Sequence, residues 1–386
     1  MSEATIVAGD HDDFMTVRHL VSRGDQVAIG RALAEEAHAL SGWRPGPADP
    51  VVNRARRTWF RQNWPQHDAR LDGVAAAFGI DPDRDDVCLD GFASVADSGC
   101  SAVWCPPSAS TDGRGRLARN YDFFTASMAE LMATFGGGGE PPVSTSDDLP
   151  IASRPYVLST FPDDGLASTV LTMSGMDGCM EGVNEAGLSV ALLIADIEAA
   201  GPPDSTAGPQ AGLDVTQVPR FLLDTCENSA QARQALLVAK QYDHGLPCHF
   251  VVADALGDGF VFERGAGGTE HFVGLVGAGP LCVTNHPLHV HTDVDRLPAD
   301  SAETMRTYER ARTLTKRTAA EPQSGDDLRA ALDDVAMEVA PDAPWRTLWR
   351  TVIDPAARSM TVRFYLGDGP GDTARYTPEL TFEVTR

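Results

Sequence analysis

Residues 97–124 read DSGCSAVWCPPSASTDGRGRLARNYDFF and predict a β-hairpin. The first half alternates as a strand does, and the turn-rich insert behind it contains Asp-Gly at 112–113, a strong hairpin signal. Pairing of the two strands would bring Arg119 and Asp122 back beside Cys100. A thiol, a guanidinium and a carboxylate would then converge at one end of the hairpin.

Cys100 has neighbours that suit a nucleophile. A thiol is already a good nucleophile, and it improves when a base lies next to it. If Cys100 were the first residue of a mature chain, its own α-amino group, which titrates near about 7.7–8.0, could be that base. Asp122 could hold the ammonium form and Arg119 the thiolate. Gly99 would let the preceding peptide bend far enough for the thiol to reach its carbonyl.

The same segment resembles the C45 peptidase-like acyl-coenzyme A:6-aminopenicillanic acid acyltransferases, which are self-cleaving N-terminal-nucleophile hydrolases. GCSAVWC…LARNYDFFTASMAELM is similar to their Gly-Cys-Thr-Thr…Asn-Trp-Asp-Phe-Phe segment. Residues 119–122 also match the Arg-Asn-x-Asp of the related choloylglycine hydrolases and penicillin V acylases. Further similarities are the GxNExGL motif at 182–188, the TNxP/TNH loop at 284–287 and the start of the proregion from His19.

This resemblance implies an α+β protein with the four-layer αββα sandwich of N-terminal-nucleophile hydrolases. It implies self-cleavage between Gly99 and Cys100, which makes residues 1–99 a mainly helical proregion and residues 100–386 the catalytic fragment. The proregion is removed or retained, and we expect the two fragments to remain associated as a heterodimer. The implied activity is hydrolysis or transfer of the acyl group of a linear amide or thioester through a cysteine acyl-enzyme. No cofactor is expected, although a coenzyme A thioester could serve as co-substrate.

Asn285 is the remaining catalytic candidate. Its residue type and place after a short apolar strand favour a turn residue that bonds its own backbone. The resemblance instead makes its amide an oxyanion-hole donor. In the choloylglycine relatives a second donor lies ten residues after the motif asparagine, but here that position is Ile194, so the second donor is unidentified. The weaker candidates for a substrate pocket are Tyr121, Asn184, His286 and Arg346.

Three alternatives compete with this interpretation. Cys105 is a rival nucleophile, but it lies mid-strand behind Trp104 and we interpret it as core. His286, His289 and His291 could serve a metal-dependent hydrolase, although no Cys pair or His-Glu-x-x-His helix completes a site. The third alternative is an uncleaved, non-catalytic relative that acts as a binding component.

Composition limits the partners and the compartment. The net charge is −24, from 55 acidic and 31 basic residues, which argues against nucleic acid or an anionic membrane as the partner. We therefore expect a small-molecule substrate. The seven cysteines are scattered and odd in number, which favours a reducing compartment. No stretch approaches the roughly 20 apolar residues that span a bilayer, and the acidic N-terminus lacks a signal core, so a cytoplasmic protein is expected.

Hydrophobic periodicity predicts a layered α+β order of elements. The segment LSVALLI at 188–194 is apolar apart from Ser189 and predicts a central strand that is buried on both faces. Helices are expected at 26–40, within 51–78, and at 218–241, 301–318 and 325–338. The other strands are expected at 15–22, 168–174, 249–254, 260–264, 281–284, 347–353, 359–366 and 379–384.

Overall fold

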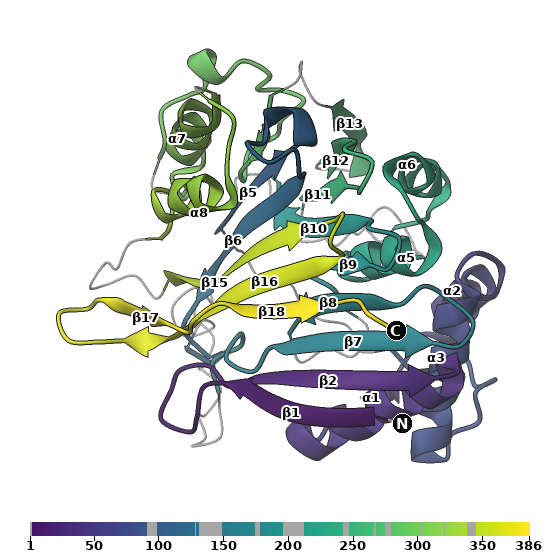
Figure 1. Cartoon of the computed structure of the whole chain (residues 1–386). Helices are drawn as coiled ribbons and strands as arrows, with labels where there is room; N and C mark the ends of the chain where they lie inside the picture. The colour runs from purple at the N-terminus through teal and green to yellow at the C-terminus, as the bar shows by residue number, and fades with distance from the viewer. Residues whose placement is uncertain are drawn as a thin grey trace.

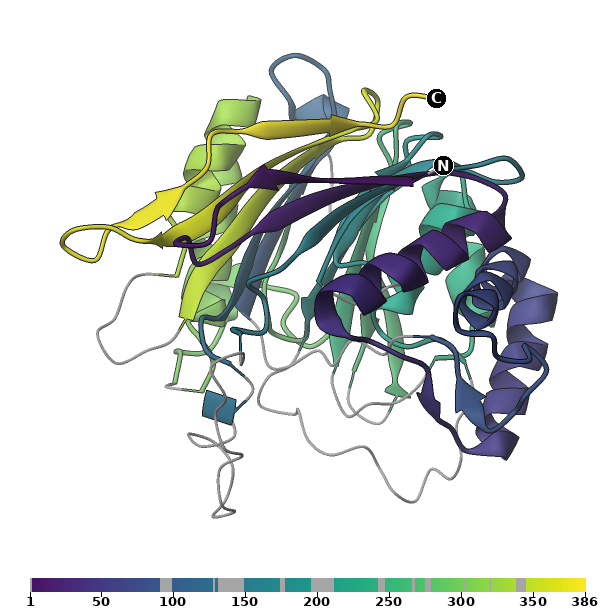
Figure 2. The same ribbon diagram turned by 90° about the horizontal axis from the view of Figure 1, so that it is seen from below.

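Two β-sheets that pack face to face form the centre of the protein in its computed structural model (Figure 1). Helices cover the outer face of each sheet, so the protein has four layers in the order αββα. Figure 2 views the sheets from their edges, with the green helices on one side and the purple and teal helices on the other. The structure describes residues 2–90, 99–127, 129–130, 149–173, 178–195, 212–241, 247–265, 268–274, 279–301, 303–319, 321–337 and 345–386.

The larger sheet has nine strands in the described part of the chain. All neighbouring pairs are antiparallel except β2 and β7, which run parallel. In spatial order the strands are β1 (Ser2–Ala8), β2 (Val17–Gly24), β7 (Tyr156–Pro162), β8 (Ser168–Thr172), β9 (Glu181–Asn184), β10 (Ser189–Ile194), β11 (Cys248–Ala253), β12 (Gly259–Arg264) and β13 (Glu270–Gly274).

The second sheet has seven strands and contains the hairpin that the sequence predicts. Its inner face packs on the larger sheet, with β5 against β10 and β11 and β16 against β9. In order the strands are β14 (Leu281–Val283), β5 (Gly99–Cys105), β6 (Arg116–Phe124), β15 (Trp345–Asp354), β16 (Ser359–Asp368) and β17 (Ala374–Tyr376), with β18 (Leu380–Glu383) also paired to β16. A separate small ribbon pairs β3 (Gly46–Pro47) with β4 (Val87–Cys88).

The helices divide between the two outer faces (Figure 1). The larger sheet is covered by α1, α5 and α6, and α3 packs on α1 with α2 beside it; the second sheet is covered by α7 and α8. Their bounds are α1 (Gln26–Ser41), α2 (Pro50–Asn63), α3 (Pro65–Phe78), α5 (Gln217–Thr225), α6 (Ser229–Val238), α7 (Thr307–Ala319) and α8 (Gly325–Asp333). Two 3₁₀ turns are η1 (Pro107–Ala109) and η3 (Val294–Arg296). Within the described residues, none of the helices is long and apolar enough to cross a membrane.

The α+β class and the αββα sandwich are therefore confirmed, and so is the central strand. β10 lies between β9 and β11 with every residue buried. In the hairpin, Gly99 pairs with Asp122 and Cys100 pairs with Tyr121. Gly113 in the connecting turn has a φ of 70°, a left-handed conformation that favours glycine. The alternation of the strand and this turn fix the register that brings the candidate residues together.

Two expectations on the elements need correction. The helix expected over 218–241 is two helices, because Asn228 caps the start of α6 by accepting from the amide of Gln231 at 3.0 Å. The segment 1–99, expected to be mainly helical with a strand at 15–22, supplies that strand as β2 and also β1, which was not expected, to the larger sheet. β2 pairs with β7 from Arg18 opposite Tyr156 onward. The two strands of a parallel pair lie far apart in sequence, so no local sequence pattern predicts which strands will pair.

Candidate active site

Cys100 lies at the start of β5, and its side chain is fully buried between the two sheets. The strand alternates, so Val103 and Cys105 face the other way and pack under α7 and α8. Arg119, on the paired strand β6, donates from Nη2 to the Cys100 Sγ at 3.3 Å and also to the carbonyl oxygen of Leu192 in β10. The structure thus brings the predicted guanidinium to the predicted thiol.

Glu181 is a site residue that the sequence interpretation missed. It lies on β9, is fully buried, and forms an ion pair with Arg119. Its second oxygen accepts a hydrogen bond from Trp349 Nε1 at 2.8 Å. A buried charge is costly unless it is paired and hydrogen-bonded, and these contacts satisfy both requirements. Glu181 therefore fixes the guanidinium that contacts the thiol and offsets part of its charge.

Asp122 lies on the opposite face of β6 from the Cys100 thiol, next to Gly99. Its Oδ1 accepts from Thr347 Oγ1 at 2.5 Å, and its Oδ2 lies 4.0 Å from Arg310 Nη1. Burial raises the pKa of this carboxyl to about 6, although the charge of Arg310 and the hydrogen bond from Thr347 oppose the rise. Asp122 is thus placed beside the Gly99–Cys100 peptide rather than beside the sulfur.

Gly99 is suited to this place by the space around it. A Cβ atom there would lie 2.9 Å from Met305 Cε and 3.4 Å from Asp122 Cβ. Its φ is not among the positive values, so in this uncleaved chain the glycine is not needed for a left-handed backbone. The close approach of Asp122 is what a side chain at position 99 would disturb. The bend required for attack on its carbonyl stays a prediction.

Asp122 predicts a pH dependence of stability. Because the folded-state pKa of about 6 lies above the ordinary value near 4, the folded chain holds this proton more tightly than the unfolded chain. The resulting stabilisation is present below about pH 4 and is lost as pH rises through about 6, a difference of about 2–3 kcal/mol. In urea unfolding of the Cys100→Ala chain between pH 4 and 7, adding Asp122→Asn should remove this part of the pH dependence. Identical pH profiles for the two proteins would contradict the prediction.

Asn285 lies directly on the backbone of the candidate nucleophile. Its Oδ1 accepts from the Cys100 N–H at 2.8 Å, and its Nδ2 donates to the carbonyl oxygen of Ile194 at 2.7 Å. A donor on one side and an acceptor on the other fix the orientation of the amide. Ile194, the position at which the resemblance led us to look for a second oxyanion donor, thus contributes its backbone carbonyl to the site. Asn285 joins the two sheets, because it bonds the start of β5 and the end of β10.

Arg310 is the arginine that the structure places at the site, in the role for which the sequence offered Arg346. It comes from α7, is buried, and donates to the Cys100 carbonyl oxygen, to Ser101 Oγ at 2.9 Å and to Asn285 Oδ1 at 2.8 Å. Arg346 instead forms an ion pair with Asp368 at 2.7 Å. The sequence contains a signal for Arg310, because helical spacing places it beside Ala311 and Leu314 on the face of α7 that is buried. A charged residue on an apolar helix face needs a buried partner.

The weaker pocket candidates lie in different places. Tyr121 is buried opposite Cys100 and stacks on Trp349 with the ring centroids 4.0 Å apart. His286 follows Asn285, and its Nδ1 lies 3.0 Å from Thr284 Oγ1. Burial, with the nearby charges of other histidines and Arg310, lowers the pKa of His286 to about 3, so it is neutral at ordinary pH.

Asn184 does not lie at Cys100 but bonds the end of α5. Its Nδ2 donates to the carbonyl oxygens of Leu223 and Cys226 at the end of α5, at 3.0 and 2.8 Å. Its Oδ1 accepts from the amides of Ala186 and Leu188 in the turn after β9. These bonds use the amide to hold the β9–β10 turn against the helix. Its part in the motif is therefore structural in this chain.

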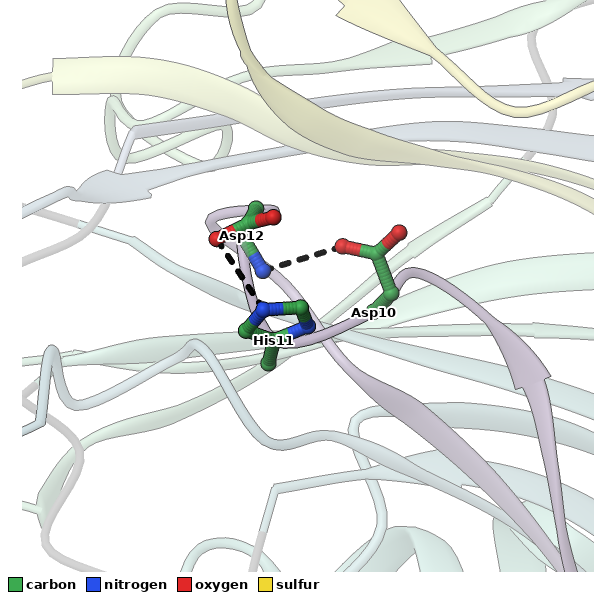
Figure 3. Close-up of side chains that lie close together, drawn as sticks. All are labelled: Asp10, His11 and Asp12. Atoms are coloured by element: carbon green, nitrogen blue, oxygen red, sulfur yellow. Dashed lines mark hydrogen bonds and ion pairs between the residues drawn. The ribbon is translucent and has the colours of Figure 1, made fainter.

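The histidines expected as an alternative metal site do not converge as ligands. His289 bonds Glu263 and stacks on His271, with ring centroids 3.7 Å apart. The rings of His286 and His291 meet edge to face with centroids 5.8 Å apart. Among the residues that the structure describes, the side chains close enough together to share an ion are Asp10, His11 and Asp12 (Figure 3).

That group is an exposed loop between β1 and β2, and its members bond one another. His11 lies 3.3 Å from Asp12, and the Asp12 amide donates to Asp10 Oδ1 at 2.9 Å (Figure 3). Exposed acidic groups of this kind commonly occur without an ion. Within the described residues, therefore, nothing favours metal-dependent hydrolysis by His286, His289 and His291.

Cys105 is confirmed as a core residue. It is buried on the helix-facing side of β5, away from the face that carries the Cys100 thiol. Burial raises the pKa of the Cys105 thiol to about 11, even with Arg116 nearby, so little thiolate exists at neutral pH. It is a poor rival for the nucleophile.

Comparison with known proteins gives one family. The sequence model described as acyl-coenzyme A:6-aminopenicillanic acid acyl-transferase matches residues 109–368, about two thirds of the chain. The match begins after Cys100 and includes Arg119, Asp122, Asn285 and Arg310. No curated protein matches significantly.

Several solved structures are similar to the chain. Penicillin V acylase from Agrobacterium tumefaciens is 17% identical, with 69% of this chain and 82% of that chain covered and a TM-score of 0.41. A mutant of conjugated bile acid hydrolase from Clostridium perfringens is 11% identical, with 74% and 96% covered and a TM-score of 0.45. A Caenorhabditis elegans ortholog of N-acylethanolamine-hydrolyzing acid amidase is 15% identical, with 72% and 100% covered and a TM-score of 0.44. On the strength of the sequence model, the chain belongs to the acyl-coenzyme A:6-aminopenicillanic acid acyl-transferase family.

Proposed function

We propose that this protein is a self-processing amidohydrolase or acyltransferase whose nucleophile is Cys100 as an N-terminal residue. The observation that carries the proposal is the set of contacts around Cys100. Arg119 donates to its sulfur, Asn285 accepts from its amide, and Arg310 donates to its carbonyl oxygen. Any buried strand residue needs partners for its backbone N–H and C=O groups, but a core thiol needs no guanidinium donor, so the Arg119 contact to the sulfur is the one that favours a nucleophile.

Self-cleavage begins with attack of the Cys100 sulfur on the carbonyl carbon of Gly99. The C–N bond breaks and the thiol proton passes to the Cys100 nitrogen, which leaves a thioester and a free amine. Water then adds to the thioester carbon and releases the Gly99 carboxyl group and the Cys100 thiol. Asp122, placed beside this peptide bond, is suited to hold the new ammonium group.

Turnover uses the same sulfur on an external carbonyl. The α-amine of Cys100 accepts the thiol proton, the thiolate adds to the acyl carbon, and the proton then passes to the leaving amine or thiolate. Water or an amine takes the acyl group from the thioester. Asn285 and backbone N–H groups hold the oxyanion, and Arg119 steadies the thiolate. The uncleaved chain already places the Cys100 nitrogen 2.8 Å from Asn285 Oδ1, so the amine forms within this set of groups.

The substrate proposed is a small linear amide or an acyl thioester. The family description, an acyl transfer from acyl-coenzyme A to an amine, supports a coenzyme A thioester as co-substrate. The proposal also places the protein in the cytoplasm, where a reactive thiol stays reduced. All seven cysteines lie among the described residues and none of them forms a disulfide, in keeping with that compartment.

A direct test is to trap the acyl-enzyme. The processed protein is mixed with acyl-coenzyme A or an activated N-acyl amide, quenched in acid, and its fragments are weighed. The fragment that begins at Cys100 should gain the mass of one acyl group, and fragmentation of the acid-quenched protein should locate that group on Cys100. A protein that is cleaved but takes no acyl group from either donor class would contradict the proposed activity.

The N-terminal fragment should stay bound after cleavage. β2 is hydrogen-bonded along β7, and Arg70 of α3 forms a buried ion pair with Asp224 of α5. Arg56 adds a hydrogen bond to the Gly212 carbonyl at 3.2 Å. Removing the N-terminal fragment would expose an open sheet edge at β7 and would take from the buried Asp224 one of its two arginine partners, leaving Arg220.

We therefore expect both fragments to co-elute as one heterodimer on native size-exclusion chromatography and to separate in denaturant. Elution of the catalytic fragment by itself under native conditions would show that the proregion is released.

A further inference from the structure

Glu263 is a buried hydrogen-bond acceptor next to the segment that carries Asn285. It lies on β12, and its side chain is fully buried. On the same face of that strand, Gly259 approaches the indole of Trp104 in β5, so Glu263 points between the two sheets. The carboxylate accepts from His249 Nε2 at 2.6 Å, from the Leu288 amide at 2.6 Å and from His289 Nδ1.

These contacts stabilise the ionised form of the Glu263 carboxylate. Burial by itself raises the pKa of a carboxyl, but here the hydrogen bond and charge of His249, with the bonds from His289 and Leu288, outweigh it and lower the pKa to about 2. The side chain is therefore an acceptor over the whole range in which an enzyme of this kind works. Hydrogen bonds to a charged group are roughly twice as strong as neutral ones.

Two of the three donors belong to the segment that carries Asn285. This segment, 284–291, leaves β14, a strand of three residues whose described sheet partner is β5. Thr284 Oγ1 donates to the Thr307 carbonyl at 2.9 Å at its start, and the bonds from Leu288 and His289 to Glu263 hold its middle. Asn285 lies between these two attachments.

We propose that Glu263 is a positioning residue: it clamps segment 284–291 to β12 and thereby fixes the Asn285 amide against Cys100. The inference rests on the proposed function for its catalytic consequence, but the clamp itself can be tested without it. Glu263 acts through Asn285 rather than on the sulfur itself. A shift of about 1 Å in a positioned group can cost roughly 10²-fold in rate.

The clamp is tested by hydrogen–deuterium exchange on the full Cys100→Ala chain. Glu263→Gln should speed exchange in peptides covering 284–291, while Glu270→Gln, an exposed carboxylate on the neighbouring strand β13, should leave it unchanged. If Glu263→Gln does not fold, His289→Ala removes one donor to Glu263 at a partly exposed position and is judged by the same criterion. Unchanged exchange in segment 284–291 would overturn the clamp.

The catalytic consequence is tested by a double-mutant cycle on the rate of self-cleavage after cell-free synthesis. Glu263→Gln should slow cleavage by about 10–100-fold in the parent but by less than about 3-fold when Asn285→Ala is already present. Equal slowing on both backgrounds would mean a general loss of structure and would overturn the positioning role. If exchange rises as expected but the parent chain never cleaves, the clamp stands and the proposed function fails.

Discussion

Intact-mass measurement of the purified protein should give two fragments of about 10.6 and 30.6 kDa, in proportion to 99 and 287 residues of the 41.2 kDa chain. The Cys100→Ala variant should remain a single chain of 41.2 kDa and should form no acyl-enzyme. The reason is that the same sulfur cleaves the chain and carries the acyl group, and alanine offers no nucleophile. Sequencing of the larger fragment should begin at Cys100.

Cys105→Ala is the matched control for this experiment. Its thiol is on the other face of β5, so self-cleavage and acylation should proceed as in the parent protein. A parent chain that stays at 41.2 kDa after prolonged incubation would remove the basis for an N-terminal nucleophile. Cleavage that continues in Cys100→Ala would point to a different nucleophile or to a contaminating protease.

Asn285→Ala should lower kcat for hydrolysis of an acyl amide by roughly 10²–10³, the usual cost of removing one oxyanion donor. Removing the amide also takes away the acceptor for the Cys100 N–H and the donor to the Ile194 carbonyl, so self-cleavage should slow as well. KM should change much less, because the lost stabilisation belongs to charge that develops during the reaction. Kinetics are measured on protein that has completed processing.

Arg346→Gln separates a site effect from a general loss of stability. The sequence makes Arg346 a pocket candidate, but its guanidinium pairs with Asp368 on the neighbouring strand. Its substitution should leave kcat within about 3-fold of the parent, because its guanidinium bonds Asp368 and the Trp345 carbonyl oxygen, although loss of this largely buried pair should lower stability. If Asn285→Ala kept the parent rate, or if Arg346→Gln lost as much, the assignment of the oxyanion group would be wrong.

What could be predicted from the sequence depended on local pattern. The hairpin followed from alternation and an Asp-Gly turn, and its register brought Arg119 next to Cys100. The run at 188–194 is apolar at every position except Ser189, which is the pattern expected of a strand buried on both faces. In the hairpin the turn and the period of two fix side-chain direction, and in the run at 188–194 the apolar composition of one short segment is the signal.

Alternation along the hairpin determines which side chains share a face, but only the tertiary structure shows which layer each face contacts. Asp122 shares its strand with Arg119 yet faces the helix layer, beside Gly99 and Arg310. The sequence placed all three groups at one end, and the odd spacing of Arg119 and Asp122 on one strand already puts these two side chains on opposite faces. Which face meets a helix is decided by packing against α7.

The sequence by itself determined the hairpin that carries Cys100, the central strand and the family resemblance. The tertiary structure decided the partners that come from distant segments, namely Glu181, Glu263 and Arg310, and the inclusion of the N-terminal strands in the larger sheet. The physical reason is that a buried charge or a parallel strand pair has no local signal. Its stability depends on a partner that only the packing of the layers brings within hydrogen-bonding distance.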